Sequence, residues 1–163
     1  KSAVTPEDVA LLSDLYDGEL ADLDAEVGRF VDALASRGLL DDTVLVVTSD
    51  HGEMFGEGSK IQHPYSLRRA LTHVPLIIRF PRVAKAGSTP AQMVQTIDLA
   101  PTRLELAGVA DTVKRHGVSL VPVLNGTATN WRASVAANPR PACSEGMRRP
   151  GYSKTSLPAI RCE

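Results

Sequence analysis

The sequence predicts an α/β fold in which a sheet is covered by helices. A long amphipathic run opens the chain, an apolar run rich in β-branched residues follows after a short loop, and a second strand-like run comes later. Helix, short loop and buried strand, in this order, are typical of α/β layer folds. With 163 residues, the chain is long enough for one ordinary domain with a core of its own.

The amphipathic run predicts one long helix. Thr5-Pro6-Glu7-Asp8 provides an N-cap hydroxyl, a proline at the first helical position and acids in the first turn. Gly38 is placed to end the helix. Apolar residues recur between them at helical spacing, at Val9, Leu12, Leu15, Leu23, Val27, Phe30, Val31 and Leu34. We expect this helix to be the main supporting element of the segment.

Two strands are predicted after the helix. Thr43–Thr48 is a continuous apolar run, which suits a strand buried on both faces of a parallel sheet. Val74–Phe80 forms the second strand, with Pro75 near its start, where proline is tolerated. Residues 81–90 read as a surface loop, and Met93-Val94 as a short third strand.

The last third of the chain changes character. Asp98 is predicted to cap a short helix that Gly108 closes. From Asn125 onward, prolines, glycines and arginines accumulate and the periodicity fades. The predicted organisation is therefore an α/β domain over residues 1–126, followed over 127–163 by a linker and the start of a small C-terminal subdomain.

Composition excludes few classes of protein. The net charge of -1 does not point to nucleic acid or to an anionic membrane surface. No apolar run approaches the roughly 20 residues of a membrane span. The chain starts at Lys1 without a signal-peptide pattern and is expected to be incomplete at both ends, so localisation and oligomeric state stay open. Cys143 and Cys162 could pair in an exported protein or remain free thiols.

The polar cluster after the first strand is the first candidate site. Ligands of open α/β sheets bind beyond the carboxyl ends of strands, where Asp50 and His51 stand. A carboxylate beside an imidazole suits Zn²⁺, Mn²⁺ or Fe²⁺, and also Ca²⁺ if oxygens complete the shell. Both side chains can meet one ligand only if the strand ends near Ser49, and Gly52 allows a sharp turn there. The alternative is that Asp50 caps a turn and His51 is a surface residue.

The polar loop between the strands holds the other candidates. His63 could donate a proton to a leaving oxygen or hold an anionic group, and Lys60 could supply similar electrostatic help. The alternatives are an exposed loop histidine and a solvated lysine. Glu53 and Glu57 could form a carboxylate pair for acid–base work, although two glutamates at this spacing are common on exposed segments.

Several blocks of the chain resemble the sulfatases of the alkaline phosphatase superfamily. They occur in the family's order and with sensible spacing over nearly the whole chain. The blocks are residues 48–57 (TSDHGEMFGE), His63, residues 66–67, residues 73–79 (HVPLIIR), residues 97–108 (IDLAPTRLELAG), residues 116–120 with 124–126, and in the tail Ser144-Glu145 and residues 159–161.

The resemblance implies an enzyme that cleaves sulfate esters with a formylglycine nucleophile and one divalent cation, usually Ca²⁺, with Mn²⁺ or Zn²⁺ as alternatives. It implies that Asp50 and His51 ligate the cation and that His63 contacts the sulfate or protonates the leaving alcohol. Lys60 is a weaker candidate for the same role. The substrate would be a small-molecule or glycan sulfate ester, and the fold would be the C-terminal part of a sulfatase-like catalytic domain over residues 1–126.

The chain also departs from the family pattern. The Cys/Ser-x-Pro-x-Arg segment that carries formylglycine does not occur in it, nor does the aspartate pair that completes the metal site, and both are expected upstream of Lys1. Arg68-Arg69-Ala70 stands where relatives often have Tyr-Asp-Glu. Two alternatives remain: a phosphodiesterase or phosphoethanolamine-type transferase of the same superfamily, and a non-catalytic metal-binding remnant.

Overall fold

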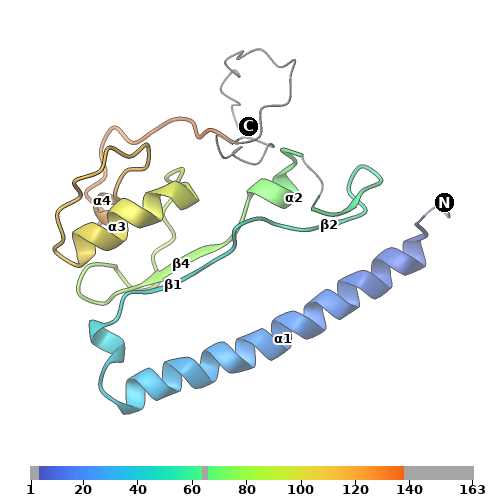
Figure 1. The fold of residues 1–163 in the computed structure, drawn as a ribbon, viewed down its shortest axis with the longest axis horizontal. Coiled ribbons are helices and arrows are strands. Elements are labelled where there is room, and N and C mark those ends of the chain that lie inside the picture. The colour runs from blue at the N-terminus through green and yellow to red at the C-terminus, as the bar shows by residue number, and fades with distance from the viewer. Residues whose placement is uncertain (1–3, 64–65, 138–163) are drawn as a thin grey trace, which may run out of the picture. The chain divides into compact units, whose positions relative to one another are not determined.

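The computed structural model describes residues 4–63 and 66–137 (Figure 1). These residues fall into two compact units, one made of 4–63 with 68–86 and the other of 66–67 with 87–137. Cys143, Cys162 and most of the predicted 127–163 region lie outside the described residues. The domain boundary predicted at residue 126 stays a prediction.

The predicted long helix is confirmed as α1, Pro6–Ser36, with both predicted ends. Thr5 and Asp8 form a capping box, in which the Asp8 amide donates to Thr5 Oγ1 at 3.1 Å and the Thr5 amide donates to Asp8 Oδ2 at 2.9 Å. Gly38 takes a φ of 66°, and its amide donates to the Ala35 carbonyl at 2.9 Å. This left-handed residue satisfies the last turn and ends the helix.

The capping box predicts a small effect of pH on α1. The Thr5 amide, and then its hydroxyl, donate to the Asp8 carboxylate and lower its pKa. The contribution of the Asp8 carboxylate to helix stability is therefore complete at pH values above the ordinary aspartate pKa of about 3.9. It is lost as the pH falls through the lower pKa that Asp8 has in the folded chain. Far-UV circular dichroism should show a smaller loss of helix between pH 5 and 2 (roughly the window in which carboxylates titrate) in Asp8→Ala than in the control Asp17→Ala. Equal losses would contradict this role of Asp8.

The apolar stripe of α1 is largely exposed, and no residue of α1 is buried. The helix contacts the β2–β3 hairpin near its N-terminal end, where the Tyr16 and Phe55 rings meet edge to face at 5.2 Å. In this chain the predicted supporting helix therefore covers little of the sheet. Its exposed large apolar residues are Leu11, Leu12, Leu15, Tyr16, Leu20, Leu23 and Phe30.

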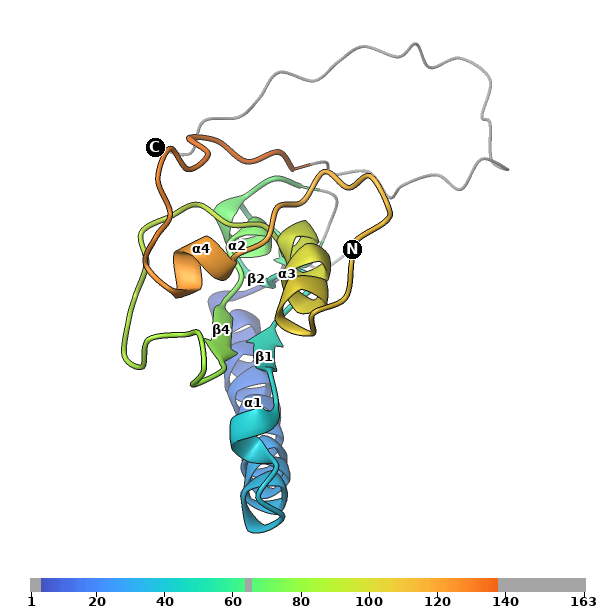
Figure 2. The same ribbon diagram turned by 90° about the vertical axis from the view of Figure 1, so that its left-hand side faces the viewer.

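The two predicted strands are confirmed as β1, Leu45–Thr48, and β4, Leu76–Arg79, but the predicted parallel sheet is wrong. The strands pair antiparallel, with Leu45 opposite Arg79, and lie side by side in Figures 1 and 2. Within this chain β1 is not buried on both faces, because Val47 is 38% exposed. The chain between the strands turns back without a crossover helix of the length that parallel pairing needs.

Ion pairs fasten the end of β4 to the turn before β1. That turn is the 3₁₀ helix η1, Leu40–Asp42. Arg79 donates to the Leu40 carbonyl at 2.7 Å and to Asp41 Oδ1 at 2.6 Å, and Arg82 pairs with Asp42. These exposed contacts connect the end of β4 to the turn before β1, at the end of the two-stranded sheet that lies away from the polar loop.

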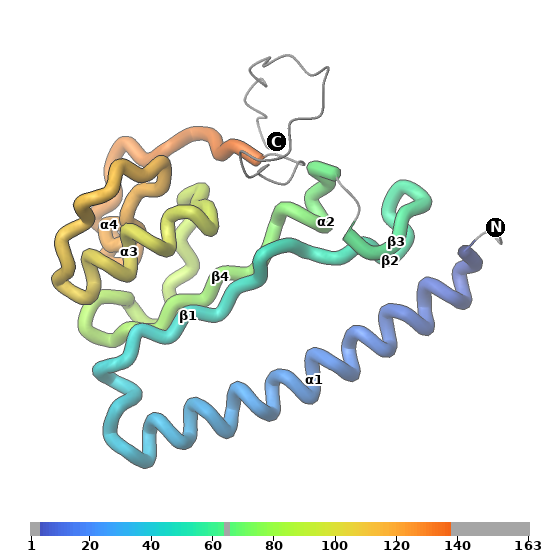
Figure 3. The backbone as a smooth tube through the Cα atoms, viewed as in Figure 1, coloured from blue at the N-terminus to red at the C-terminus, as the bar shows by residue number. Residues whose placement is uncertain are grey.

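The polar loop contains a hairpin and a short helix, which follow β1 in Figure 3. The hairpin consists of β2, Met54–Phe55, and β3, Ile61–Gln62, in antiparallel register, and the helix is α2, Arg69–Thr72. The Met54 side chain is completely buried, and Leu71 of α2 is also buried. The loop is therefore anchored by apolar side chains next to the candidate site.

The second unit is organised around a buried carboxylate. Its elements are η2, Thr96–Asp98, α3, Leu99–Leu106, and α4, Val121–Leu124. The predicted short helix is confirmed as α3, closed by Gly108 with a φ of 67°. Asp98 stands at the predicted N-cap position of α3, but its fully buried carboxylate makes no cap hydrogen bond to that helix. It accepts from the amides of Gln95 and Val118 and from Arg132.

The predicted strand at Met93-Val94 is also wrong. The Met93 carbonyl accepts a hydrogen bond from Trp131 Nε1 at 2.7 Å, so a side chain takes the place of a neighbouring strand. None of the helices in the described parts of the chain is long and apolar enough to span a bilayer.

Candidate functional site

The candidate site lies in the loop that begins where β1 ends. β1 stops at Thr48, as the sequence analysis required, so Asp50 and His51 are not held on opposite faces of a strand. Ser49 Oγ donates to the His51 carbonyl at 2.6 Å, and the Gly52 amide donates to the Leu71 carbonyl at 2.9 Å. The loop is thereby attached to α2.

Gly52 is required at this point by close approach of two backbone segments. A Cβ at Gly52 would lie 1.8 Å from the carbonyl oxygen of Ala70. We expect Gly52→Ala to lower the free energy of unfolding by about 1–3 kcal/mol, because the backbone of α2 would have to move. The control is Gly28→Ala in α1, which meets nothing within 4 Å and should stabilise slightly. Chemical denaturation measures both variants, and equal midpoints would contradict the predicted clash.

Asp50 and His51 bring two possible metal-ligand atoms close together. His51 Nε2 lies 3.8 Å from Asp50 Oδ1, and the Asp50 side chain is 87% exposed. His51 Nδ1 lies 2.9 Å from the Gly52 carbonyl, which can only accept, so Nδ1 carries a hydrogen and Nε2 has the lone pair when the ring is neutral. This is the tautomer of a histidine that ligates a metal through Nε2, and such ligands usually donate the other ring N–H to an acceptor.

These two residues fit part of the cation site that the family resemblance implies. Each Ca²⁺–oxygen distance in proteins is about 2.3–2.6 Å, so two ligand atoms of one cation can lie up to twice that distance apart. The two atoms of this pair are 3.8 Å apart, so one cation could contact both of them. Within residues 4–63 and 66–137, however, no group of three or more His, Cys, Asp or Glu side chains is arranged to hold a metal. The two atoms alone would leave most of a Ca²⁺ shell of about six to eight ligands to other groups.

His63 is brought against this pair by the hairpin. Its ring stacks on the His51 ring at 4.5 Å between centroids, with 30° between the planes. Its Nδ1 lies 3.2 Å from Glu53 Oε2. The structure thus joins His63 to Asp50 and His51, three of the four residues singled out from the sequence.

Glu53 is a residue of the cluster whose partner the sequence analysis did not identify. The structure does not pair it with Glu57, because Glu57 Oε2 accepts from the Phe55 amide at 2.7 Å and belongs to the hairpin turn. Glu53 instead meets His63, ten residues away across the β2–β3 hairpin. A prediction of that hairpin from the glycines at its turn could have indicated the contact.

Lys60 is exposed at the end of the same hairpin, where its carbonyl accepts from the Gly56 amide at 2.8 Å. Among the described residues, no hydrogen bond or ion pair joins the Lys60 ammonium to either histidine of the site. The structure does not bring Lys60 into the cluster, and its role stays a prediction.

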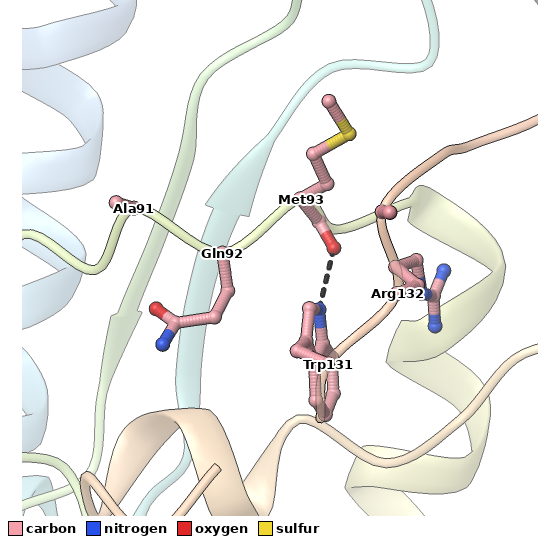
Figure 4. A pocket seen from close by; sticks show the side chains of 6 residues that line it. Ala91, Gln92, Met93, Trp131 and Arg132 are labelled. Atoms are coloured by element: carbon pink, nitrogen blue, oxygen red, sulfur yellow. Dashed lines mark hydrogen bonds between the residues drawn. The ribbon is translucent and has the colours of Figure 1, made fainter. Parts of the chain in front are cut away.

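A pocket in the second unit is lined by Ala91, Gln92, Met93, Trp131, Arg132 and Ala133 (Figure 4). Arg132 lies 5.5 Å from the centre of the Trp131 ring and donates to Asp98 at 2.8 Å and to Gln95 Oε1 at 3.1 Å. Its guanidinium is therefore already committed to the buried network.

Comparison with known proteins supports the family resemblance. Residues 5–109 match the family model described as Sulfatase. N-acetylglucosamine-6-O-sulfatase of Bacteroides thetaiotaomicron is 38% identical over 113 residues, which are 68% of this chain and 20% of that protein. Arylsulfatase K of Xenopus laevis is 34% identical over 142 residues, 86% of this chain and 26% of that protein. Phosphonate monoester hydrolase from Silicibacter pomeroyi superposes with a TM-score of 0.75 and 36% identity, over 80% of this chain and 26% of that one.

Because the family match covers more than half of the residues, the chain belongs to the sulfatase family of the alkaline phosphatase superfamily. Its mixed α/β structure matches part of the fold of a sulfatase and of a phosphonate monoester hydrolase. The chain spans about a fifth to a quarter of the length of the curated relatives it matches.

Proposed function

We propose that the chain is the part of a sulfate-ester hydrolase that supplies two metal ligands and a proton donor. Asp50 and His51 would hold one divalent cation, Ca²⁺ by family resemblance, with Mn²⁺ or Zn²⁺ as alternatives. The observation that carries the proposal is the cluster at the end of β1. Asp50 Oδ1, His51 Nε2 and the His63 ring converge there, and His51 is fixed in the tautomer that leaves Nε2 free.

The bound cation would act as a Lewis acid, neutralising charge that builds on the sulfate oxygens. His63, in its protonated form, would give the Nε2 proton to the leaving oxygen as the sulfur–oxygen bond breaks. An oxygen of the nucleophile would form the new bond to sulfur while the electron pair of the broken bond goes to the leaving oxygen. His63 would be left neutral with its remaining hydrogen on Nδ1, facing Glu53. The formylglycine nucleophile and the other metal ligands would come from polypeptide outside residues 1–163.

The substrate class follows from relatives and is also a proposal. The N-acetylglucosamine-6-O-sulfatase is named for a sulfated sugar, and it is 38% identical to this chain over the aligned residues. We propose a sulfated sugar as the substrate of the longer polypeptide in which this chain works. The polar, exposed loop that holds Asp50 and His63 suits a hydrophilic ester.

The second candidate is hydrolysis of a phosphorus ester. The observation that favours it is the similarity to phosphonate monoester hydrolase, at 36% identity and a TM-score of 0.75. A cation held by Asp50 and His51 could neutralise phosphoryl oxygens in the same way as sulfuryl oxygens. A non-catalytic remnant is the third candidate, which the half-complete metal site of the chain alone would suit.

Metal binding tests the proposed role of Asp50 and His51. The chain of 163 residues should bind Ca²⁺ or Mn²⁺ weakly and hydrolyse no aryl sulfate, because two ligands leave the coordination shell open. In the longer polypeptide, calorimetry should show stoichiometric binding that Asp50→Ala abolishes and Asp24→Ala, an exposed position of α1, leaves intact. Tight binding by the short chain, or unchanged binding in the Asp50→Ala polypeptide, would contradict the proposal.

A further inference from the structure

Glu53 combines a largely buried carboxylate with an exposed histidine partner. Its side chain is 24% exposed, whereas that of His63 is 58% exposed. A carboxylate withdrawn from water is costly unless hydrogen bonds compensate, so its few partners are informative. The proposed metal site uses Asp50 and His51 and includes no role for Glu53.

Both oxygens of the Glu53 carboxylate are engaged. Oε1 accepts from the Met54 amide at 3.4 Å, and Oε2 lies 3.2 Å from His63 Nδ1. Met54 is the first residue of β2, and its side chain is completely buried. The Glu53 carboxylate is therefore hydrogen-bonded to the first residue of a strand whose side chain is anchored in the core.

The backbone at His63 is also constrained. Gln62 has a φ of 67°, which is uncommon for a residue other than glycine, and it pairs with Met54 in the hairpin register. Such conformations persist where the surrounding structure imposes them, and they concentrate at functional sites. The His63 ring also stacks on the His51 ring, with 4.5 Å between the ring centroids. His63 thus follows a residue with a left-handed backbone and is held by its ring face and by Nδ1.

The Glu53 contact also selects a tautomer. An ionised carboxylate only accepts hydrogen bonds, so Nδ1 of His63 carries the hydrogen, and Nε2 is the nitrogen left for another partner. We propose that Glu53 is a positioning residue that fixes the ring and tautomer of His63 and so presents Nε2 to the leaving oxygen of the ester. This inference rests on the proposed function, in which His63 acts on that oxygen.

The tautomer can be measured without turnover. The chain labelled with ¹⁵N-histidine gives separate imidazole signals by NMR, and His63→Gln identifies those of His63. At a pH where the rings are neutral, His63 should be mainly in the Nδ1–H form. Glu53→Met, of similar length but without an acceptor oxygen, should convert it mainly to the Nε2–H form, and Glu53→Gln, which keeps an acceptor, should restore the Nδ1–H form.

Matched controls separate positioning from general damage. Glu57→Met removes a neighbouring carboxylate that binds the Phe55 amide, and it should leave the His63 tautomer unchanged. The signals of His73 and His116, exposed residues outside the cluster, report in the same spectra that the variants are folded. Wild-type His63 mainly in the Nε2–H form, or a His63 signal unaffected by Glu53→Met, would overturn the inference.

Activity of the longer polypeptide distinguishes this inference from the proposed function. Glu53→Met should lower kcat for a sulfate ester with little change in KM, with partial recovery in Glu53→Gln. If His63→Ala lowers turnover while Glu53→Met changes neither kcat nor the tautomer, the role of Glu53 is wrong and the function stands. If the tautomer responds to Glu53→Met while neither variant affects turnover, the function is wrong and the Glu53–His63 contact stands.

Discussion

Asp98→Ala is expected to destabilise the chain by about 3–5 kcal/mol, because it breaks a buried ion pair and leaves the other partner uncompensated. The Asp98 carboxylate is fully buried and Arg132 is 17% exposed, at 2.8 Å from it. Asp98 also accepts from the Gln95 and Val118 amides, so three segments lose a common acceptor.

The loss should be measured by chemical denaturation against Asp41→Ala. Asp41 pairs with Arg79 at 2.6 Å, but its side chain is 79% exposed. An exposed pair contributes only about 0–1 kcal/mol, so this control should change little. Asp98→Asn keeps acceptor oxygen and should fall between the two. A loss for Asp98→Ala no larger than that for Asp41→Ala would contradict the account of the buried network.

His63→Ala is expected to lower kcat of the longer polypeptide by about 10²–10⁴-fold, the usual contribution of a positioned general acid. His63 stacks on His51 and is the one histidine that the hairpin brings to the proposed metal ligands. The loss should be larger for an alkyl sulfate ester than for an aryl ester with a good leaving group, because the poorer leaving group depends more on protonation.

The control for His63 is His116→Ala, which removes an exposed imidazole of the second unit. Steady-state hydrolysis of the two esters by each variant measures the effect. A fall of kcat in His63→Ala that is equal for both esters would speak for a positioning role in place of proton transfer. Unchanged kcat for both esters would remove His63 from the mechanism.

The local elements were predictable from local signals. Thr5, Pro6 and Gly38 define the ends of α1 through capping interactions between near neighbours, and Gly108 closes α3 in the same way. β1 and β4 could be placed from their β-branched runs. Such features need only residues within a few positions of one another, which a single sequence displays.

The predictions that were wrong concern contacts between residues far apart in the sequence. The antiparallel pairing of β1 with β4 is set by how the chain returns, and hydrophobic runs alone do not contain that information. Asp98 looked like a helix cap, but Arg132, 34 positions later, competes for its carboxylate. Met93-Val94 has strand-forming residues, yet the indole of Trp131 binds the Met93 carbonyl.

The candidate site was predicted in part. Asp50, His51 and His63 were singled out by residue type and position after a strand, and the structure brings them together. Whether they ligate a cation and act on a sulfate stays a prediction. The partner of His63 could not be read from spacing, because Glu53 reaches it only through the β2–β3 hairpin.

Release of inorganic sulfate from N-acetylglucosamine 6-sulfate by the longer polypeptide tests the central claim most directly. The matched substrate is a phosphonate monoester, and the matched variants are Asp50→Ala and Asp24→Ala. The account predicts sulfate release faster than phosphonate hydrolysis, lost in Asp50→Ala and kept in Asp24→Ala. Faster hydrolysis of the phosphonate, or sulfate release that survives Asp50→Ala, would contradict it.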